Sequence, residues 1–316
     1  MNGRPSDGPS FELRHLRYFV AVAEERNFGR AAERLGIAQP GLSQQIASLE
    51  TLVGTRLLDR SRRLFRLTLA GQVFLTEARK TLSQADAALA AVQRAARGEI
   101  GRISIGYVAS AAYAGVLTEL VSGFRNAFPE VDLVMIEMEM GRQLDQIVEG
   151  ALDFGFIRPP AAVPRSVQTL TVLSEPLAAV LPVHHPLAGD EKVDLDGLAN
   201  ETFITPNQPA DVGFRRQTIM ACKAAGFDPI IEPIAGDFTT IASMVGVGLG
   251  IALAPLSTAC LQLPGIVYRR LQQGDVSSEI AVAFRRNEGA PAVGAFIAHC
   301  RTEAARQARL AAGISH

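Results

Sequence analysis

Hydrophobic positions in the first part of the chain repeat at helical spacing in three short runs. The runs are Leu16, Phe19, Val20 and Ala23, then Phe28, Ala31, Ala32 and Leu35, then Leu42, Ile46, Leu49 and Val53. Spacings of three and four place each run on one face of a helix, and Gly36 is a stop signal after the second run. The pattern therefore predicts three short helices, with only a few residues between the second and the third.

The third predicted helix has a polar outward face near its start. A short turn between Leu35 and Pro40 makes two helices cross steeply and lets the later one enter a DNA major groove. Glutamine can pair through two hydrogen bonds with adenine. We therefore expect DNA contacts from this helix and from the start of the preceding one, at Arg30, Gln39, Pro40, Gly41, Ser43 and Gln44. The alternative is an ordinary solvated helix surface.

Arginines follow in a stretch typical of a two-stranded hairpin, and they favour the DNA interpretation. Arg60, Arg62 and Arg63 suit phosphate oxygens beside a base-reading helix. Residues 11–71 hold ten arginines against six acidic residues, which gives a net charge of +4. In the first ten residues one arginine and one aspartate cancel. Since the whole chain carries −1, residues 72–316 carry −5. A basic head on an acidic body is typical of a polyanion-binding module attached to another domain. We predict a winged helix-turn-helix over 12–71.

A longer periodic segment comes next. Its apolar positions alternate spacings of three and four, at Leu75, Ala78, Leu82, Ala85, Leu89, Val92 and Ala96. Such a heptad seam predicts one long linker helix over 72–98 that pairs with the same helix of a second copy. The alternative is a helix that lies on its own domain.

After Gly98 to Gly101 short strands alternate with amphipathic helices. This alternation over about two hundred residues predicts parallel sheets covered by helices, in two lobes. Crossovers near 172–177 and 271–280 would insert lobe 2 (about 174–274) into lobe 1 (about 99–173 and 275–309). Ligands of such sheets bind where strand ends of opposing lobes meet.

Several residues are candidates for that cleft. Ser110 stands between a strand and a helix, where its hydroxyl and free amides would receive a carboxylate, although an ordinary helix cap explains it as well. Thr205 and Pro206 end a strand of lobe 2 and would form the opposite wall, and we place Phe238 in the same cleft. Arg158 follows a strand and is either a second anion anchor or a surface charge.

The run LRYFVAVAEERNFGRAAERLGIAQPGLSQQIASLETLVGTRLLDRSRRLFRLTLAG resembles the DNA-binding domain of LysR-type transcriptional regulators. The phrases FRNAFPEVDL, LDFGFIRPP, VLPVHHPLAG and MVGVGLGIALAP resemble the periplasmic-binding-protein-like effector domain of that family. The resemblance implies an α+β multidomain protein whose linker helix dimerises. It also implies that Gln39, Pro40, Ser43 and Gln44 face DNA. Many members have arginine where Gln44 stands, so one charged contact is replaced by a neutral one.

The phrases IGYVASAAY and FGFIR are similar to the branch that responds to aromatic compounds and ring-cleavage acids. That resemblance implies effector binding at Ser110. A threonine or serine usually helps to hold the effector where Met140 stands, and a thioether cannot donate a hydrogen bond. We therefore expect an aromatic carboxylate or related catabolic acid, with a monocarboxylate or a more apolar aromatic favoured over a diacid.

Other classes of protein find less support. Three well-separated cysteines argue against a disulfide framework and favour a reducing cytoplasm. The start of the chain has no long apolar run, and we see no catalytic constellation and no motif for a metal or cofactor. We predict a cytoplasmic regulator, not an enzyme, that binds double-stranded promoter DNA, a small effector, its own copies as a homodimer or homotetramer, and RNA polymerase. A small-molecule-binding protein or an enzyme on the same cleft stays open.

Overall fold

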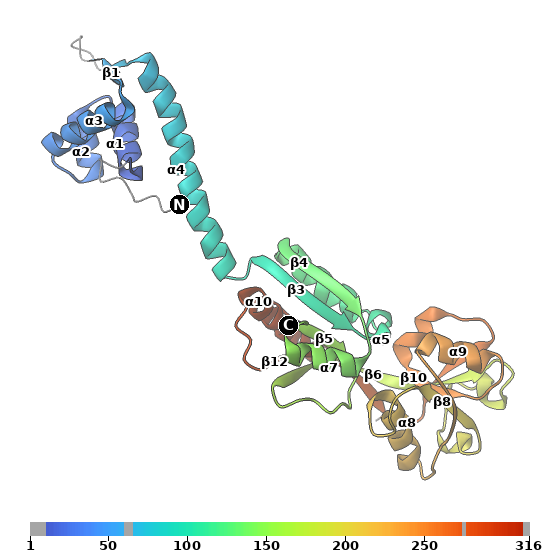
Figure 1. Cartoon of the computed structure of the whole chain (residues 1–316). Helices are drawn as coiled ribbons and strands as arrows, with labels where there is room; N and C mark the ends of the chain where they lie inside the picture. The colour runs from blue at the N-terminus through green and yellow to red at the C-terminus, as the bar shows by residue number, and fades with distance from the viewer. Residues whose placement is uncertain (1–10, 60–65, 274–275, 312–316) are drawn as a thin grey trace. The chain divides into compact units, whose positions relative to one another are not determined.

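The computed structural model describes residues 11–59, 66–273 and 276–311. The chain divides into two compact units, with the boundary between Gln93 and Arg94. Figure 1 shows both units and labels many of their helices and strands.

The first unit is a small helical head followed by a hairpin and a long helix. Its elements are α1 (Leu13–Glu25), α2 (Phe28–Leu35), α3 (Gln39–Val53), β1 (Leu58–Asp59), β2 (Arg66–Leu67) and α4 (Leu69–Ala96), the last of which reaches into the second unit (Figure 1). Asn27 caps α2 by accepting a hydrogen bond from the amide of Arg30. Gly36 ends α2 in the left-handed conformation (φ 67°), a geometry that glycine adopts without strain. The three predicted helices are present.

Apolar side chains of α1, α2 and α3 form the core of the head. Phe19, Leu42, Ile46 and Leu49 are fully buried, and Phe74 of α4 packs edge-on against Phe19 with ring centroids 5.1 Å apart. Burying side chains of this size stabilises a fold by about 1.5–3 kcal/mol each. The core fixes α3 so that its opposite face points outward.

The hairpin follows α3 and is attached to it. Strands β1 and β2 pair antiparallel. One carboxylate oxygen of Glu50 accepts hydrogen bonds from the amides of Leu57 (2.8 Å) and Leu58 (3.0 Å). This contact holds the first strand against the end of α3. The predicted DNA contacts Arg60, Arg62 and Arg63 lie outside the described residues.

Helix α4 contains the predicted seam, but the seam is used in two ways. Its first positions, Leu75 and Ala78, pack on the head. Farther along, Leu89 and Val92 are 63% and 69% exposed. The pattern of Leu75 and Ala78 is therefore explained within the chain, and only the later positions are available to a partner.

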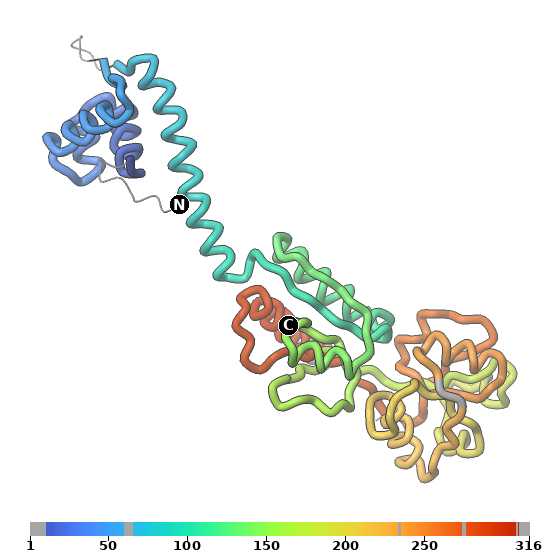
Figure 2. Tube along the Cα trace, viewed as in Figure 1, coloured from blue at the N-terminus to red at the C-terminus, as the bar shows by residue number. Residues whose placement is uncertain are grey.

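The second unit begins with lobe 1. Its helices and strands are β3 (Ile100–Tyr107), α5 (Ala109–Tyr113), η1 (Leu117–Val121, a π-helix), α6 (Ser122–Ala127), β4 (Glu130–Glu137), α7 (Met140–Glu149), β5 (Phe154–Ile157), the first half of β6 (Val167–Pro182), β12 (Ser277–Arg285) and α10 (Pro291–Ala311). The strand order is β4-β3-β5-β12-β6. Figure 2 shows that the red end of the chain returns to the green part to complete this lobe.

Lobe 2 lies between the two strands that cross. Its elements are the second half of β6, η2 (Pro186–Gly189), β7 (Lys192–Val193), η3 (Asp196–Leu198), β8 (Thr202–Pro206), α8 (Gly213–Ala224), β9 (Ile230–Ala235), α9 (Phe238–Gly246), β10 (Ala252–Pro255), η4 (Leu256–Leu261) and β11 (Ile266–Leu271). Its core gathers around Phe203, Leu253 and Ile241.

The sheets are mixed, which corrects the prediction of parallel sheets. Strand β3 pairs parallel with β4 and β5, and β8 pairs parallel with β9. However, β12 runs antiparallel to β5 and β6, and β10 and β11 run antiparallel to β6. The reason is that β6 and β12 carry the chain out to lobe 2 and back, so they run in opposite directions.

Strand β12 is buried on both faces of the lobe 1 sheet. Ile280, Val282 and Phe284 join the cluster under α6 and α10, whereas Ala281 and Ala283 join the cluster under α7. Neighbouring strand residues point to opposite faces. Helices therefore cover both faces of this sheet, and the edge where its strands end faces lobe 2.

Candidate nucleic-acid interface and ligand pocket

The exposed face of α3 holds five of the residues predicted to contact DNA. Gln39, Pro40, Gly41, Ser43 and Gln44 are all exposed on the first two turns. The buried residues Leu42, Ile46 and Leu49 hold the opposite face of the helix. The structure thus brings these polar groups together on a rigid, outward-facing surface of the size that enters a major groove.

Gly41 has no packing role in the protein alone. In the described part of the chain, a Cβ atom added at Gly41 would meet no heavy atom within 4 Å beyond its neighbours and the backbone of its own helix, and the backbone there is helical. Glycine inside a helix costs about 1 kcal/mol relative to alanine. The open space at this position leaves the backbone accessible to a close partner.

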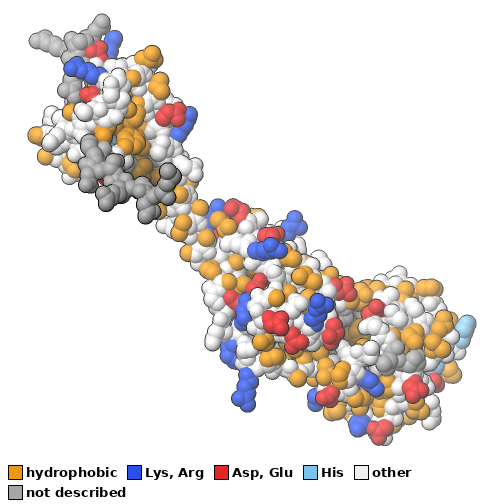
Figure 3. All heavy atoms as spheres, in the orientation of Figure 1, with side chains coloured by type: hydrophobic (Ala, Val, Ile, Leu, Met, Phe, Trp, Pro, Cys, Tyr) orange, Lys and Arg blue, Asp and Glu red, His pale blue; other side chains and the backbone are white. Residues whose placement is uncertain are grey.

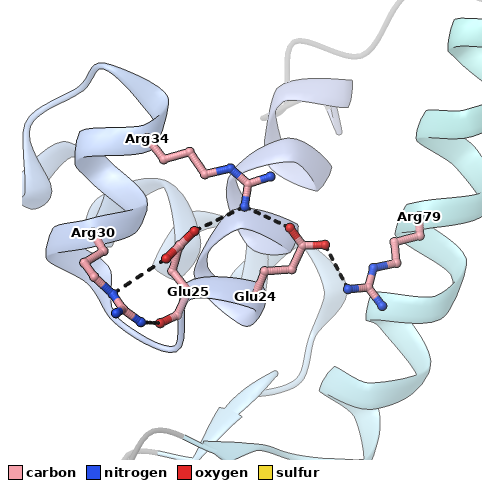
Figure 4. A network of polar contacts seen from close by, with 5 residues as sticks. All are labelled: Glu24, Glu25, Arg30, Arg34 and Arg79. Carbon is pink, nitrogen blue, oxygen red and sulfur yellow. Dashed lines mark hydrogen bonds and ion pairs between the residues drawn. The ribbon is translucent and has the colours of Figure 1, made fainter.

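Arg30 belongs to a network of charged side chains that links α1, α2 and α4 (Figure 4). Its guanidinium donates to the backbone oxygen of Glu25 (2.7 Å), and Arg34 contacts the carboxylates of Glu24 (2.9 Å) and Glu25 (3.4 Å). Glu24 also accepts from Arg79 of α4 at 2.8 Å. The hydrogen bonds from Arg79 and Arg34 lower the pKa of Glu24 below its usual value.

The network positions Arg30 without removing it from solvent. Its side chain is 66% exposed, and its nearest carboxylate contact, with Glu25, is long at 3.6 Å. Exposed ion pairs of this kind contribute at most about 1 kcal/mol. A phosphate can therefore compete with Glu25 for the Arg30 guanidinium.

The second unit contains a pocket of about 320 Å³ between its lobes. Four helices begin at its wall: α5, α7, α8 and α9. Carboxylates also line it, at Glu137, Glu139 and Asp237, together with the amide of Gln208 and the ring of Phe214. The volume suits a small organic molecule.

Most of the predicted cleft residues line this pocket. Ser110, Met140 and Arg158 line it from lobe 1, and Pro206 and Phe238 line it from lobe 2. Thr205 does not line it: the residue is only 1% exposed, and its hydroxyl has no hydrogen-bond partner in the described part of the chain. Successive strand residues point to opposite faces, so Pro206 and Thr205 cannot both face the pocket.

Arg158 is buried at the pocket wall, 4% exposed, which rules out the alternative of a surface charge. Its guanidinium donates to Ser110 Oγ (3.1 Å), Ser278 Oγ (2.7 Å) and Glu175 Oε1 (3.0 Å). Burial lowers the pKa of Arg158, and the Glu175 carboxylate opposes that shift. Glu175 also accepts from the amide of Ser257 (2.9 Å), so the ion pair joins both lobes near the crossing strands.

Sequence reasoning missed the acidic residues of this pocket. Asp237 and Glu139 precede helices and cap them, and a capping residue before an apolar-periodic run is a recognisable signal. Glu175 gave no such signal, because it lies inside a strand and its partner Arg158 is 17 residues away.

Comparison with known proteins agrees with both halves of the structure. The family described as "Bacterial regulatory helix-turn-helix protein, lysR family" matches residues 13–72, and "LysR substrate binding domain" matches residues 96–305. No described helix has both the length and the apolar character needed to cross a membrane.

Individual relatives match along nearly the whole chain. The uncharacterised HTH-type transcriptional regulator YnfL of Escherichia coli K12 is 38% identical over 291 residues, 92% of this chain and 98% of that protein. AlsR of Bacillus subtilis, an HTH-type transcriptional regulator, is 37% identical over 286 residues, 90% of this chain and 94% of that protein.

Solved structures match in the same way. The crystal structure of CbnR, a LysR family transcriptional regulator, has a TM-score of 0.80 at 28% identity and covers 92% of this chain and 100% of CbnR. Full-length CbnR complexed with its target DNA has a TM-score of 0.76 at 29% identity, with 93% and 100% covered. These matches confirm the family and fold class predicted from the sequence: the chain belongs to the LysR family of bacterial transcriptional regulators.

Proposed function

We propose that this regulator reads promoter DNA with the exposed face of α3 and is controlled by a small organic effector bound in the pocket between the lobes. The observation that carries the DNA half is the polar surface of Gln39, Ser43 and Gln44, which the buried core of the head holds outward. In support, the relative CbnR has been crystallised with its target DNA. Binding to promoter DNA implies that the protein acts in the cytoplasm.

For the effector half, the pocket supports a ligand with an apolar body. Met140, Phe214 and Phe238 line it, and the rest of the lining mixes apolar and polar residues. An aromatic ring of the predicted effector class fits such a lining.

We further propose that the protein works as a homo-oligomer built on α4. The exposed side chains of Leu89 and Val92 continue the heptad seam beyond the head, and Figure 3 shows orange side chains along this part of the helix. Apolar positions at heptad spacing pair two helices. A dimer would present two α3 helices to successive half-sites, and dimers of dimers and contact with RNA polymerase would follow at the promoter.

Catalysis is not part of the proposal. Burial raises the pKa of the Cys222 and Cys300 thiols to about 12, so both stay protonated and are poor nucleophiles. Among the described residues, no group of three His, Cys, Asp or Glu side chains is arranged to hold a metal ion.

Two double variants test the DNA half by fluorescence anisotropy. Ser43→Ala with Gln44→Ala should weaken binding to the specific promoter about tenfold and leave binding to random DNA nearly unchanged, because base contacts carry the specificity. Arg62→Ala with Arg63→Ala should weaken binding to both DNAs. It should also reduce the salt dependence by about one unit of slope for each phosphate that is no longer neutralised.

Gln72→Ala is the matched control, since Gln72 is also an exposed polar residue of the first unit but lies on α4. It should bind both DNAs like the wild type. An equal drop in affinity for specific and random DNA in the α3 variant would contradict its role in base reading.

A further inference from the structure

We propose that the pocket selects against carboxylates and accepts an effector whose polar end donates hydrogen bonds, such as a protonated amine on an apolar body. This inference rests on the proposed function only in taking this pocket as the effector site. It departs from the sequence-based expectation of an acid. Three features of the pocket carry it: a neutralised arginine, occupied helix starts and an acidic rim.

First, the single arginine of the lining is already neutralised. Each guanidinium nitrogen of Arg158 donates to a protein oxygen, on Ser110, Ser278 or Glu175. Arginine captures a carboxylate best when two of its N–H groups are free to bind in parallel. The buried Glu175 already pairs with one of these nitrogens through Oε1, so an incoming carboxylate would have to compete with an internal one.

Second, the starts of the three longer helices at the pocket are occupied by the chain's own oxygens. Glu139 accepts from Gly141 in α7 (3.3 Å), Gln208 accepts from Phe214 in α8 (2.8 Å), and Asp237 accepts from Thr240 in α9 (2.8 Å). The first amides of a helix attract anions because they lack partners within the helix. At each of these three helices at least one of those amides already has a side-chain acceptor.

Third, the rim of the pocket is acidic. Glu137, Glu139 and Asp237 all line it and are exposed, and Arg158 is the only lysine or arginine among the described lining residues. Like charges repel a carboxylate, and the same oxygens accept hydrogen bonds from an ammonium or hydroxyl group. The local charge therefore favours a donor.

The apolar wall supplies the place for the rest of the ligand. Phe214 and Phe238 pack edge to face, with ring centroids 4.8 Å apart, and Met140 lines the pocket from the other lobe. An ammonium close to aromatic rings gains a further cation–π attraction. The pocket thus combines an apolar body site with an acidic end.

Three probes with one carbon skeleton test the proposal on the full chain: benzylamine, benzyl alcohol and benzoate. The chain has no tryptophan, so Phe238→Trp gives a fluorescence signal that reports from this pocket alone. Calorimetry on the unsubstituted protein checks the ranking. Benzylamine should bind most tightly, at least about fivefold more tightly than benzoate, as expected for one partly exposed charge contact.

Charge-neutral variants then assign the effect to residues. Asp237→Asn, which keeps an oxygen to cap α9, and Glu137→Gln should each weaken benzylamine about fivefold and leave benzyl alcohol unchanged. Glu191→Gln removes an exposed carboxylate that does not line the pocket, and it should bind all three probes like the wild type.

Glu175→Gln tests the neutralised arginine directly. The substitution frees Arg158 and should raise benzoate affinity about tenfold. Breaking a buried ion pair destabilises a protein, so thermal unfolding must first show that the variant is folded. If this variant does not fold, the two rim variants decide the proposal, since their carboxylates are exposed.

Any ranking in which benzylamine is not the tightest of the three probes would overturn the proposal. If the fluorescence of the Phe238→Trp protein responds most strongly to benzoate, the preference for an amine is overturned. The pocket would still be the effector site. If calorimetry shows that benzylamine binds but none of the pocket variants changes its affinity, the ligand binds elsewhere. The proposed effector site itself would then be wrong.

Discussion

At the scale of single residues, the two candidate sites differ in how completely their groups are engaged. On α3, the side chains of Ser43 and Gln44 are exposed and accessible to a partner. In the pocket, Arg158 is buried and each of its guanidinium nitrogens donates to a protein oxygen, and Asp237 and Glu139 already cap helices. An exposed polar surface suits a large, hydrated partner such as DNA. A pocket whose polar groups already pair with one another selects its ligand by the charge that remains at its rim.

Gly41→Ala separates folding from DNA binding at one residue. The added methyl meets no side chain among the described residues, so we expect the free energy of unfolding to rise, by up to about 1 kcal/mol. If DNA approaches the backbone here, the same methyl should lower DNA affinity about tenfold or more. Chemical unfolding and anisotropy measure the two effects. Unchanged DNA affinity would show that DNA does not approach α3 at this point.

At the scale of elements, much of the fold could be predicted because local signals and packing agree. The apolar spacing and Gly36 indicated three helices, which the structure contains as α1, α2 and α3. The strand directions were harder to predict, because β12 is buried on both faces from Ile280 to Phe284 and shows no alternation there. The direction of β6 and β12 depends on lobe 2 being inserted between them, which no local pattern specifies.

The candidate site could be predicted only in part, for a similar reason. Ser110, Met140, Arg158, Pro206 and Phe238 line the pocket as placed from the sequence, and whether they bind an effector stays a prediction. The pairing of Arg158 with Glu175 depends on the tertiary fold. From its place after a strand, Arg158 was a candidate for binding an anionic ligand. In the structure its guanidinium pairs instead with the carboxylate of Glu175.

Gly71→Ala tests how α4 is attached to the hairpin. A Cβ atom at Gly71 would lie 2.0 Å from the backbone oxygen of Leu57, so backbone must move. We expect the head to lose roughly 2 kcal/mol or more of stability, the range of an overpacked core. Thermal unfolding gives the result, and Gly41→Ala is the control in the same unit. A fully stable Gly71→Ala protein would contradict this close packing.

Leu89→Asp with Val92→Asp tests pairing along the exposed part of α4. Charges at two seam positions should disrupt a helix pair, since apolar seam contacts hold such helices together. Sedimentation should show a shift toward the monomer, with Ala87→Asp, an exposed position off the seam, as the matched control. An unchanged oligomer in the double variant would place the interface elsewhere.

At the scale of the whole molecule, a positively charged reading head is joined to an acidic domain that carries the pocket. Residues 11–71 carry +4 within a chain of net charge −1. DNA affinity that depends on phosphate contacts falls as salt rises, whereas base contacts set the preference between sequences. In the proposed function the head supplies both terms of DNA binding, and the second unit regulates them.

The most direct test is the affinity of the full-length protein for the DNA upstream of its own gene and for scrambled DNA of the same length and composition, each at two salt concentrations. We expect the upstream DNA to bind at least about a thousandfold more tightly, and affinity for both to fall steeply with salt. Equal affinity for the two DNAs at both salt concentrations would contradict the central claim that α3 reads a specific promoter.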